Sequence, residues 1–112
     1  MIRFDDIVEK LNPYLKSSDI DEIKKAYAYS AKVHAGQKRY SGEPYMIHPM
    51  EVTSILADIK LDKNSIITGL LHDTIEDTLA TEDDIKKLFG SEVSELVNGV
   101  TKIGQLSISS KF

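Results

Sequence analysis

The residues of this sequence best suited to chemistry lie in the run HDTIEDT, residues 72–78. His72 and Asp73 are adjacent, and Glu76 and Asp77 follow about one helical turn later. Imidazole and carboxylate groups in this combination are ligands of divalent transition-metal ions. On a continuous helix His72 would neighbour Glu76, and Asp73 would neighbour Asp77, so that four polar groups converge on one small volume. The run therefore predicts a divalent-metal site of the kind that a phosphohydrolase needs, with a solvated acidic face as the plainer alternative.

A second histidine, His48, stands directly before a proline, where the backbone is restricted. Alone it is more typical of a structural side chain than of a ligand, but together with His72 and Asp73 it completes a set of two imidazoles and a carboxylate. Such a set suits Mn, Fe, Co, Ni or Zn, and an ion held there could activate a water molecule and polarise a phosphoryl oxygen. Glu76 and Asp77 could orient that water or take up its proton.

The basic residues nearest to this candidate site are Lys38 and Arg39, in the run QKRYSGEPYMIHP at residues 37–49. Arg39 could stack on a purine or bind a phosphate through two hydrogen bonds, and Ser41 could donate a hydrogen bond. A solvated loop would explain the same residues. The glycine and prolines predict an irregular loop, and its apolar side chains are expected to lie against the core or over a pocket. His34, on the preceding helix, is assigned to packing or local hydrogen bonding.

Apolar residues recur at helical spacing through most of the chain, which predicts an all-α fold. Helices are expected over about residues 1–15, 17–35, 49–59, 64–78 and 81–89, and from 91 onward. Thr81 and Asp84 resemble a capping box, and Gly36 and Gly90 are expected to end helices. The apolar faces expected to be buried in the third and last of these helices are Val52, Ile55, Leu56 and Ile59, and Val93, Leu96, Val97 and Val100.

Length and composition indicate a single domain, which we place at residues 1–104, followed by a tail at 105–112 that is frayed or contacts another copy. With 41% apolar and 29% charged residues the chain has the composition of a globular protein, and it contains no cysteine. No apolar run approaches the roughly 20 residues that span a bilayer, so we expect a cytoplasmic protein. The formal charge of −4 argues against binding to long nucleic acid, while a small phosphorylated ligand fits.

Three runs, HAGQKRYSGEPYMIHP, ITGLLHDTIEDT and FGSEVSELVNGVTKI, resemble the hydrolase domain of RelA/SpoT homologues within the HD superfamily, over about residues 20–104. The resemblance implies an all-α HD-domain bundle that uses Mn²⁺ to hydrolyse the 3′-pyrophosphate of guanosine tetra- or pentaphosphate, giving GDP or GTP and pyrophosphate. It implies His48, His72 and Asp73 as metal ligands, and Glu76 and Asp77 as the acids that act on the nucleophilic water.

The same resemblance implies that Arg39 and Ser41 contact the guanosine. It also shows departures: Tyr40 stands where the family often has Lys, and Asn98 where it often has Asp. The family's fourth metal ligand, an Asp in a later LADRLHNMRT-like motif, has no counterpart in this sequence. We therefore expect a bundle of about five or six helices that is incomplete at its C-terminus.

Three functions remain open from the sequence. The first is the alarmone hydrolase that the resemblance implies. The second is a truncated, catalytically impaired paralogue that binds nucleotide or a partner chain without turnover, and the third is an HD phosphohydrolase for another nucleotide. Apolar surface left at the incomplete end could also be covered by a second copy in a homo-oligomer.

Overall fold

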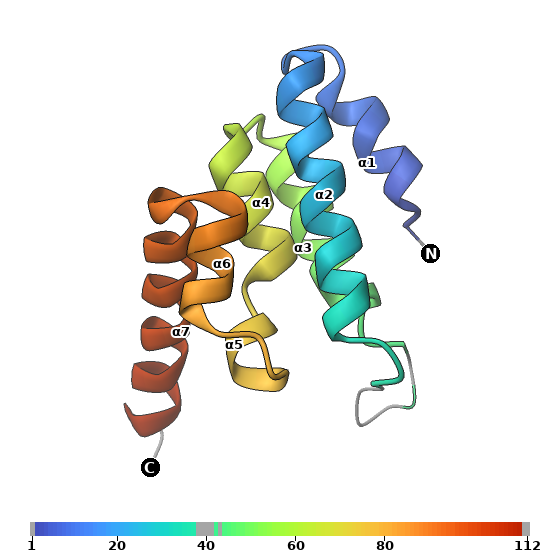
Figure 1. Cartoon of the computed structure of the whole chain (residues 1–112). Coiled ribbons are helices and arrows are strands. Elements are labelled where there is room, and N and C mark those ends of the chain that lie inside the picture. The colour runs from blue at the N-terminus through green and yellow to red at the C-terminus, as the bar shows by residue number, and fades with distance from the viewer. Residues whose placement is uncertain (1, 38–41, 43, 111–112) are drawn as a thin grey trace.

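The computed structural model describes residues 2–37, 42 and 44–110, with the backbone alone described for 104–110. The part of the chain that is described contains seven helical segments. Figure 1 shows how they are arranged. They are α1 (Phe4–Leu11), α2 (Ser17–Val33), α3 (Ile47–Asp58), α4 (Lys63–Leu71), α5 (Thr74–Asp77), α6 (Glu82–Phe89) and α7 (Ser91–Ser110). The predicted all-α class is therefore confirmed.

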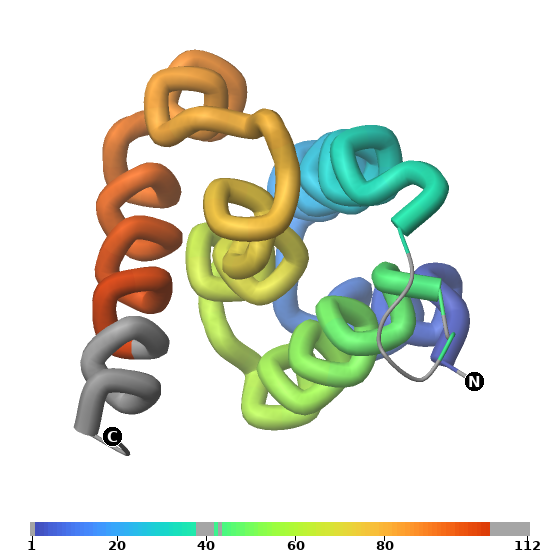
Figure 2. Tube along the Cα trace, turned by 90° about the horizontal axis from the view of Figure 1, so that it is seen from below, coloured from blue at the N-terminus to red at the C-terminus, as the bar shows by residue number. Residues whose placement is uncertain are grey.

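Helix α4 lies at the centre of the bundle, between α7 on one side and α2 and α3 on the other (Figure 2). Helix α1 packs on α3, and α6 packs on α7. The central position follows from the sequence of α4, because a helix that is apolar nearly all round must be covered on every side. Its fully buried side chains are Ile66, Ile67, Leu70 and Leu71.

Two predicted helix ends have the expected chemistry. The Thr81 hydroxyl accepts a hydrogen bond from the Asp84 amide at 3.2 Å, and the Asp84 carboxylate accepts one from the Thr81 amide at 3.0 Å. This reciprocal pair is the capping box that starts α6. Gly90, with φ of +97°, ends α6 in a backbone conformation that residues with a Cβ rarely adopt.

The prediction of one helix over residues 64–78 is wrong. Helix α4 ends at Leu71, a turn follows at residues 72 and 73, and the separate four-residue helix α5 begins at Thr74. Apolar periodicity alone does not report such a break, because Ile75 continues the spacing of the preceding apolar residues. The break also gives one more helical segment than the upper number expected for the bundle. At the other end of the chain, the helical backbone of α7 continues to Ser110, into the segment 105–112 that we expected to be a tail, frayed or in contact with another copy.

Two of the predicted buried faces are also partly wrong. Ile55 and Ile59 on α3 are 61% and 62% exposed, and Leu96 and Val100 on α7 are 38% and 42% exposed. Helix α3 instead buries a mixed face of small and polar residues together with one methionine: Pro49, Met50, Thr53, Ser54 and Ala57.

Leu96 and Val100 of α7 face Val52 and Leu56 of α3 across an apolar groove, which we call the α3–α7 groove. Its volume is about 340 Å³, and its lining residues are Val52, Leu56, Leu61, Ser65, Thr68, Gly69, His72, Leu96 and Val100. Gly69 forms part of the floor, where a Cβ would lie 2.7 Å from a methyl carbon of Leu56. The close approach of α3 and α4 therefore depends on the missing side chain at residue 69. Within the described residues, no helix has the length and apolar character to cross a membrane.

Candidate metal centre

The end of α4 orients the first candidate ligand, His72. Because the helix stops at Leu71, carbonyl groups in its last turn lack the usual amide partners from a following turn. One of them, the carbonyl oxygen of Gly69, lies 2.7 Å from Nδ1 of His72. A carbonyl can only accept a hydrogen bond, so Nδ1 carries the hydrogen and Nε2 is the atom turned toward the site. Such a partner on the second ring nitrogen is the usual means of fixing a metal-binding histidine.

Asp73 follows in the turn and is the residue that precedes the first turn of α5. Its Oδ2 lies 3.2 Å from Nε2 of His72 and 3.9 Å from Nε2 of His48. Thr74 stabilises this turn: it is fully buried, and its hydroxyl donates a hydrogen bond to the Leu71 carbonyl at 2.8 Å. A single carboxylate oxygen therefore faces both imidazole rings.

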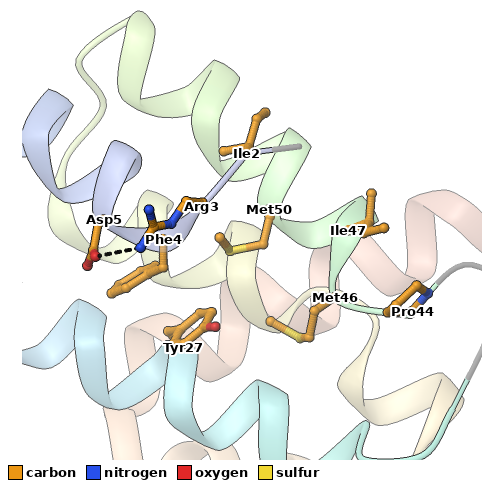
Figure 3. Close-up of a pocket in the computed structure, with 9 residues that line it drawn as sticks. All are labelled: Ile2, Arg3, Phe4, Asp5, Tyr27, Pro44, Met46, Ile47 and Met50. Atoms are coloured by element: carbon orange, nitrogen blue, oxygen red, sulfur yellow. Dashed lines mark ion pairs between the residues drawn. The ribbon is translucent and has the colours of Figure 1, made fainter.

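His48 reaches the site from a different element, the first turn of α3. The residues just before it pack down on a cavity of about 450 Å³ between α1, α2 and α3, shown in Figure 3. Pro44, Met46 and Ile47 line that cavity on one side, opposite the stacked rings of Phe4 and Tyr27. This packing agrees with the expectation that apolar residues of the 37–49 loop lie against the core or over a pocket. The same contacts anchor the backbone that carries His48.

The three side chains are partly buried: 36% of His48, 15% of His72 and 21% of Asp73 is exposed. Burial lowers the pKa of His72, but the hydrogen bond and charge of Asp73, the Gly69 carbonyl and the charge of Asp77 outweigh it, so the pKa is raised overall. Burial likewise raises the pKa of Asp73, but the hydrogen bond and charge of His72 and the charges of the other two histidines lower it overall. The pair therefore favours a positive charge between Nε2 and Oδ2, and a cation can take the place of the proton.

The donor set also fits a metal ion in spacing. One nitrogen or oxygen from each of His48, His72 and Asp73 lies within 4.8 Å of the others, and within the described residues this is the one such group. Ligands at right angles on an ion with bonds of about 2.1 Å are about 3.0 Å apart, close to the 3.2 Å between His72 and Asp73. Two imidazoles and a carboxylate are the ligands that Mn, Fe, Co, Ni and Zn accept.

Glu76 and Asp77 are exposed on α5 and do not belong to this group. Asp73 and Asp77 keep the predicted spacing of one helical turn, because the Asp77 amide donates to the Asp73 carbonyl at 3.0 Å. Both acids on α5 also line a cleft of about 710 Å³ beside α2, together with Tyr29, Val33, Gln37, Thr78, Leu79, Ala80 and Asp84.

Sequence reasoning missed the partners of Asp77. The Tyr45 hydroxyl donates a hydrogen bond to Oδ2 of Asp77, and Nε2 of Gln37 donates to its main-chain oxygen at 2.7 Å. Neither contact has a local signal, because the partners are 32 and 40 residues apart in the chain. The predicted ligand contacts Arg39 and Ser41 lie outside the described residues, as do Lys38 and Tyr40.

Comparison with known proteins identifies the family of this domain. The family model described as the HD domain matches residues 26–111. A GTP pyrophosphokinase of Myxococcus xanthus is 61% identical over 110 residues, which is 95% of this chain and 14% of that protein. The bifunctional (p)ppGpp synthase/hydrolase SpoT of Escherichia coli K12 is 43% identical over 111 residues, 99% of this chain and 16% of SpoT.

A solved structure is similar as well. It belongs to a metazoan ortholog of SpoT described as hydrolysing ppGpp and acting in starvation responses. That chain is 34% identical, superposes with a TM-score of 0.69, and the match covers 79% of this chain and 49% of the other. The chain thus spans a small part of the two bacterial relatives and about half of the metazoan one.

Proposed function

Since the chain belongs to the HD domain family, whose model matches residues 26–111, we propose that it is a metal-dependent hydrolase of guanosine tetra- or pentaphosphate. The reaction releases the 3′-pyrophosphate and leaves GDP or GTP. The observation that carries this proposal is the gathering of ligand atoms from His48, His72 and Asp73 within 4.8 Å of one another. The choice of substrate is supported by two relatives, the (p)ppGpp synthase/hydrolase SpoT and the metazoan ortholog that hydrolyses ppGpp.

His48, His72 and Asp73 would hold the ion, and we propose Mn²⁺. When bound, the ion supplies a Lewis acid that polarises the phosphoryl group. The protein's own contribution is to present Nε2 of His72 with the hydrogen already committed to the Gly69 carbonyl, so that binding needs no change of tautomer. Asp73 supplies a negative charge that offsets the charge of the ion.

Glu76 and Asp77 are proposed to take the proton of the attacking water. The water oxygen forms a bond to phosphorus, the bond from that phosphorus to the 3′ oxygen breaks, and the 3′ oxygen gains a proton. Exposed carboxylates on the cleft of about 710 Å³ can accept such a proton, and they are three and four residues beyond Asp73. From the family resemblance, we propose that Arg39 and Ser41 contact the guanosine. We also propose that the protein is cytoplasmic.

The test is pyrophosphate release from guanosine tetraphosphate as Mn²⁺ is titrated. Wild type should release pyrophosphate only with metal, Asp73→Asn should lose release by losing metal, and Glu76→Gln should bind metal but turn over slowly. A loss of about 100-fold or more is expected for the proton-accepting groups. Release that is independent of metal, or unchanged in Asp73→Asn, would contradict the assignment.

A second candidate function is nucleotide or partner binding without turnover. It is favoured by the α3–α7 groove, whose exposed apolar walls suit another polypeptide. A rise in melting temperature on adding guanosine tetraphosphate, without pyrophosphate release, would support this function over the first.

A further inference from the structure

Two residues outside the metal-ligand group contact Asp77, and a third supports both of them. Tyr45, from the loop before α3, donates its hydroxyl hydrogen to Oδ2 of Asp77. Gln37, just after α2, donates from Nε2 to the main-chain oxygen of the same residue at 2.7 Å. His34, at the end of α2, contacts both of these residues. Asp77 is therefore held through its side chain and its backbone by segments far away in sequence.

The contact between His34 and Gln37 fixes the orientation of both. Because Nε2 of Gln37 donates to Asp77, its Oε1 is the atom that lies 3.0 Å from Nδ1 of His34. An amide oxygen only accepts, so Nδ1 of His34 must carry the hydrogen. Both polar atoms of the Gln37 side-chain amide, Oε1 and Nε2, are thus engaged in hydrogen bonds.

The ring of Tyr45 lies on the ring of His34, with centroids 4.3 Å apart and planes inclined by 12°. His34 is only 3% exposed, so the ring on which Tyr45 stacks is itself fixed by the surrounding core. Offset stacking of two rings restricts the position of the phenol beyond what a loop backbone could achieve. The hydroxyl of Tyr45 is therefore aimed at Asp77 by a rigid neighbour.

Asp77 needs such external support because of the element that carries it. Helix α5 has four residues, and one isolated turn of helix is not stable by itself. The carboxylate is on the surface, where a side chain without partners samples several rotamers. A hydrogen bond to Oδ2 restricts that freedom. Among the residues that the structure describes, none donates a hydrogen bond to Oδ1, which can accept one from a water molecule.

We propose that Tyr45, Gln37 and His34 form a clamp that positions Asp77 for proton transfer, with Tyr45 as the member that orients the carboxylate. This inference rests on the proposed hydrolase function. Reaction rates depend steeply on such positioning, and a displacement of 1 Å can cost about 100-fold. The clamp acts through Asp77 and not through the metal ligands.

The variant Tyr45→Phe tests the clamp because it removes the hydroxyl and keeps the ring that stacks on His34. Its kcat should fall by about tenfold or more, while KM and the amount of bound Mn²⁺ stay within about twofold of wild type. The matched control is Tyr14→Phe, which also removes a tyrosine hydroxyl that donates a hydrogen bond. The acceptor of the Tyr14 hydroxyl is the main-chain carbonyl of Leu61, at 2.8 Å. The control should keep wild-type kcat. A kcat for Tyr45→Phe within about twofold of wild type would overturn the proposal.

A second measurement does not need turnover. Melting temperatures are compared for wild type, Tyr45→Phe, Asp77→Ala and the double variant, all without metal. The drop caused by Tyr45→Phe should disappear when residue 77 is alanine, because the hydroxyl then has no carboxylate to lose. Equal drops in both backgrounds would show that Tyr45 does not act on Asp77 and would overturn the clamp. If the wild-type chain released no pyrophosphate, the hydrolase function would be refuted. The melting comparison would still show whether the Tyr45 hydroxyl acts on Asp77.

Discussion

Replacing Asp73 with asparagine tests the metal centre without any need for catalysis. Oδ2 of Asp73 is the atom that faces both rings, at 3.2 Å from His72 and 3.9 Å from His48. Asparagine keeps the shape of the side chain and removes its charge. The variant therefore changes the charge of one ligand and leaves the packing around the turn in place.

The expected loss of affinity follows from the charge. A divalent ion and a carboxylate at a typical metal–oxygen bond of about 2.1 Å attract each other by about 4 kcal/mol, even with the dielectric constant of water. That energy corresponds to a factor of about 1,000 in the dissociation constant. The amide oxygen of asparagine remains a neutral ligand and recovers part of it. Mn²⁺ should therefore bind to Asp73→Asn about 100 to 1,000 times more weakly than to wild type.

Free Mn²⁺ in solution has a strong electron paramagnetic resonance signal at room temperature, so a titration followed by this signal measures binding directly. Asp77→Asn is the matched control, because it removes the same charge from a residue on α5 outside the ligand group. Its affinity should stay within about threefold of wild type, since partly exposed charges that do not touch the ion are screened. Equal losses in the two variants would show general attraction by acids instead of ligation, and an Asp73→Asn variant that binds like wild type would refute the site.

Three further predictions concern protons, stability and association. In EDTA, the pair of Asp73 and His72 should raise the melting temperature over that of Asp73→Asn between the ordinary pKa values of 3.8 and 6.5. Because the pKa of His72 is raised and that of Asp73 is lowered, this advantage should be lost as the pH rises through the folded pKa of His72, or falls through that of Asp73. Thermal melts across this range check the sign, and an advantage that grows toward alkaline pH would contradict it. Thr81→Ala removes the capping box of α6 and should lower the free energy of unfolding by about 1 kcal/mol in urea titrations, whereas an unchanged value would count against the cap. If the α3–α7 groove binds a second copy of the chain, Val100→Ser should weaken self-association in sedimentation experiments, and a monomeric wild type would rule this out.

The parts of the fold that the sequence predicted are those set by local chemistry. Helix-period apolar residues gave the all-α class, and Thr81 with Asp84 marked the start of α6 through hydrogen bonds within four residues. Which apolar face is buried depends on neighbours that periodicity does not report. Helix α3 shows this, because its isoleucines at 55 and 59 are exposed while Thr53 and Ser54 are buried.

In the candidate site, too, the sequence predicted some features, while others depend on contacts between distant segments. The sequence singled out His48, His72 and Asp73, and the structure brings their ligand atoms together, because two of them are adjacent and the third begins a helix that packs on α4. Their role as metal ligands stays a prediction. The contacts of Asp77 with Tyr45 and Gln37 could not be predicted, because they depend on where the 37–49 loop meets α5 in space.

The break between α4 and α5 is the feature on which the geometry of the centre depends. The backbone of both His72 and Asp73 stays in the right-handed helical region although the helical hydrogen bonding of α4 stops before them. Ending α4 at Leu71 frees the Gly69 carbonyl to hold Nδ1 of His72, and Nε2 of the same ring then lies 3.2 Å from Oδ2 of Asp73. The same termination therefore orients His72, while α3 packs on α4 and brings the ring of His48 edge-on to that of His72, with centroids 5.3 Å apart and the same carboxylate oxygen facing both.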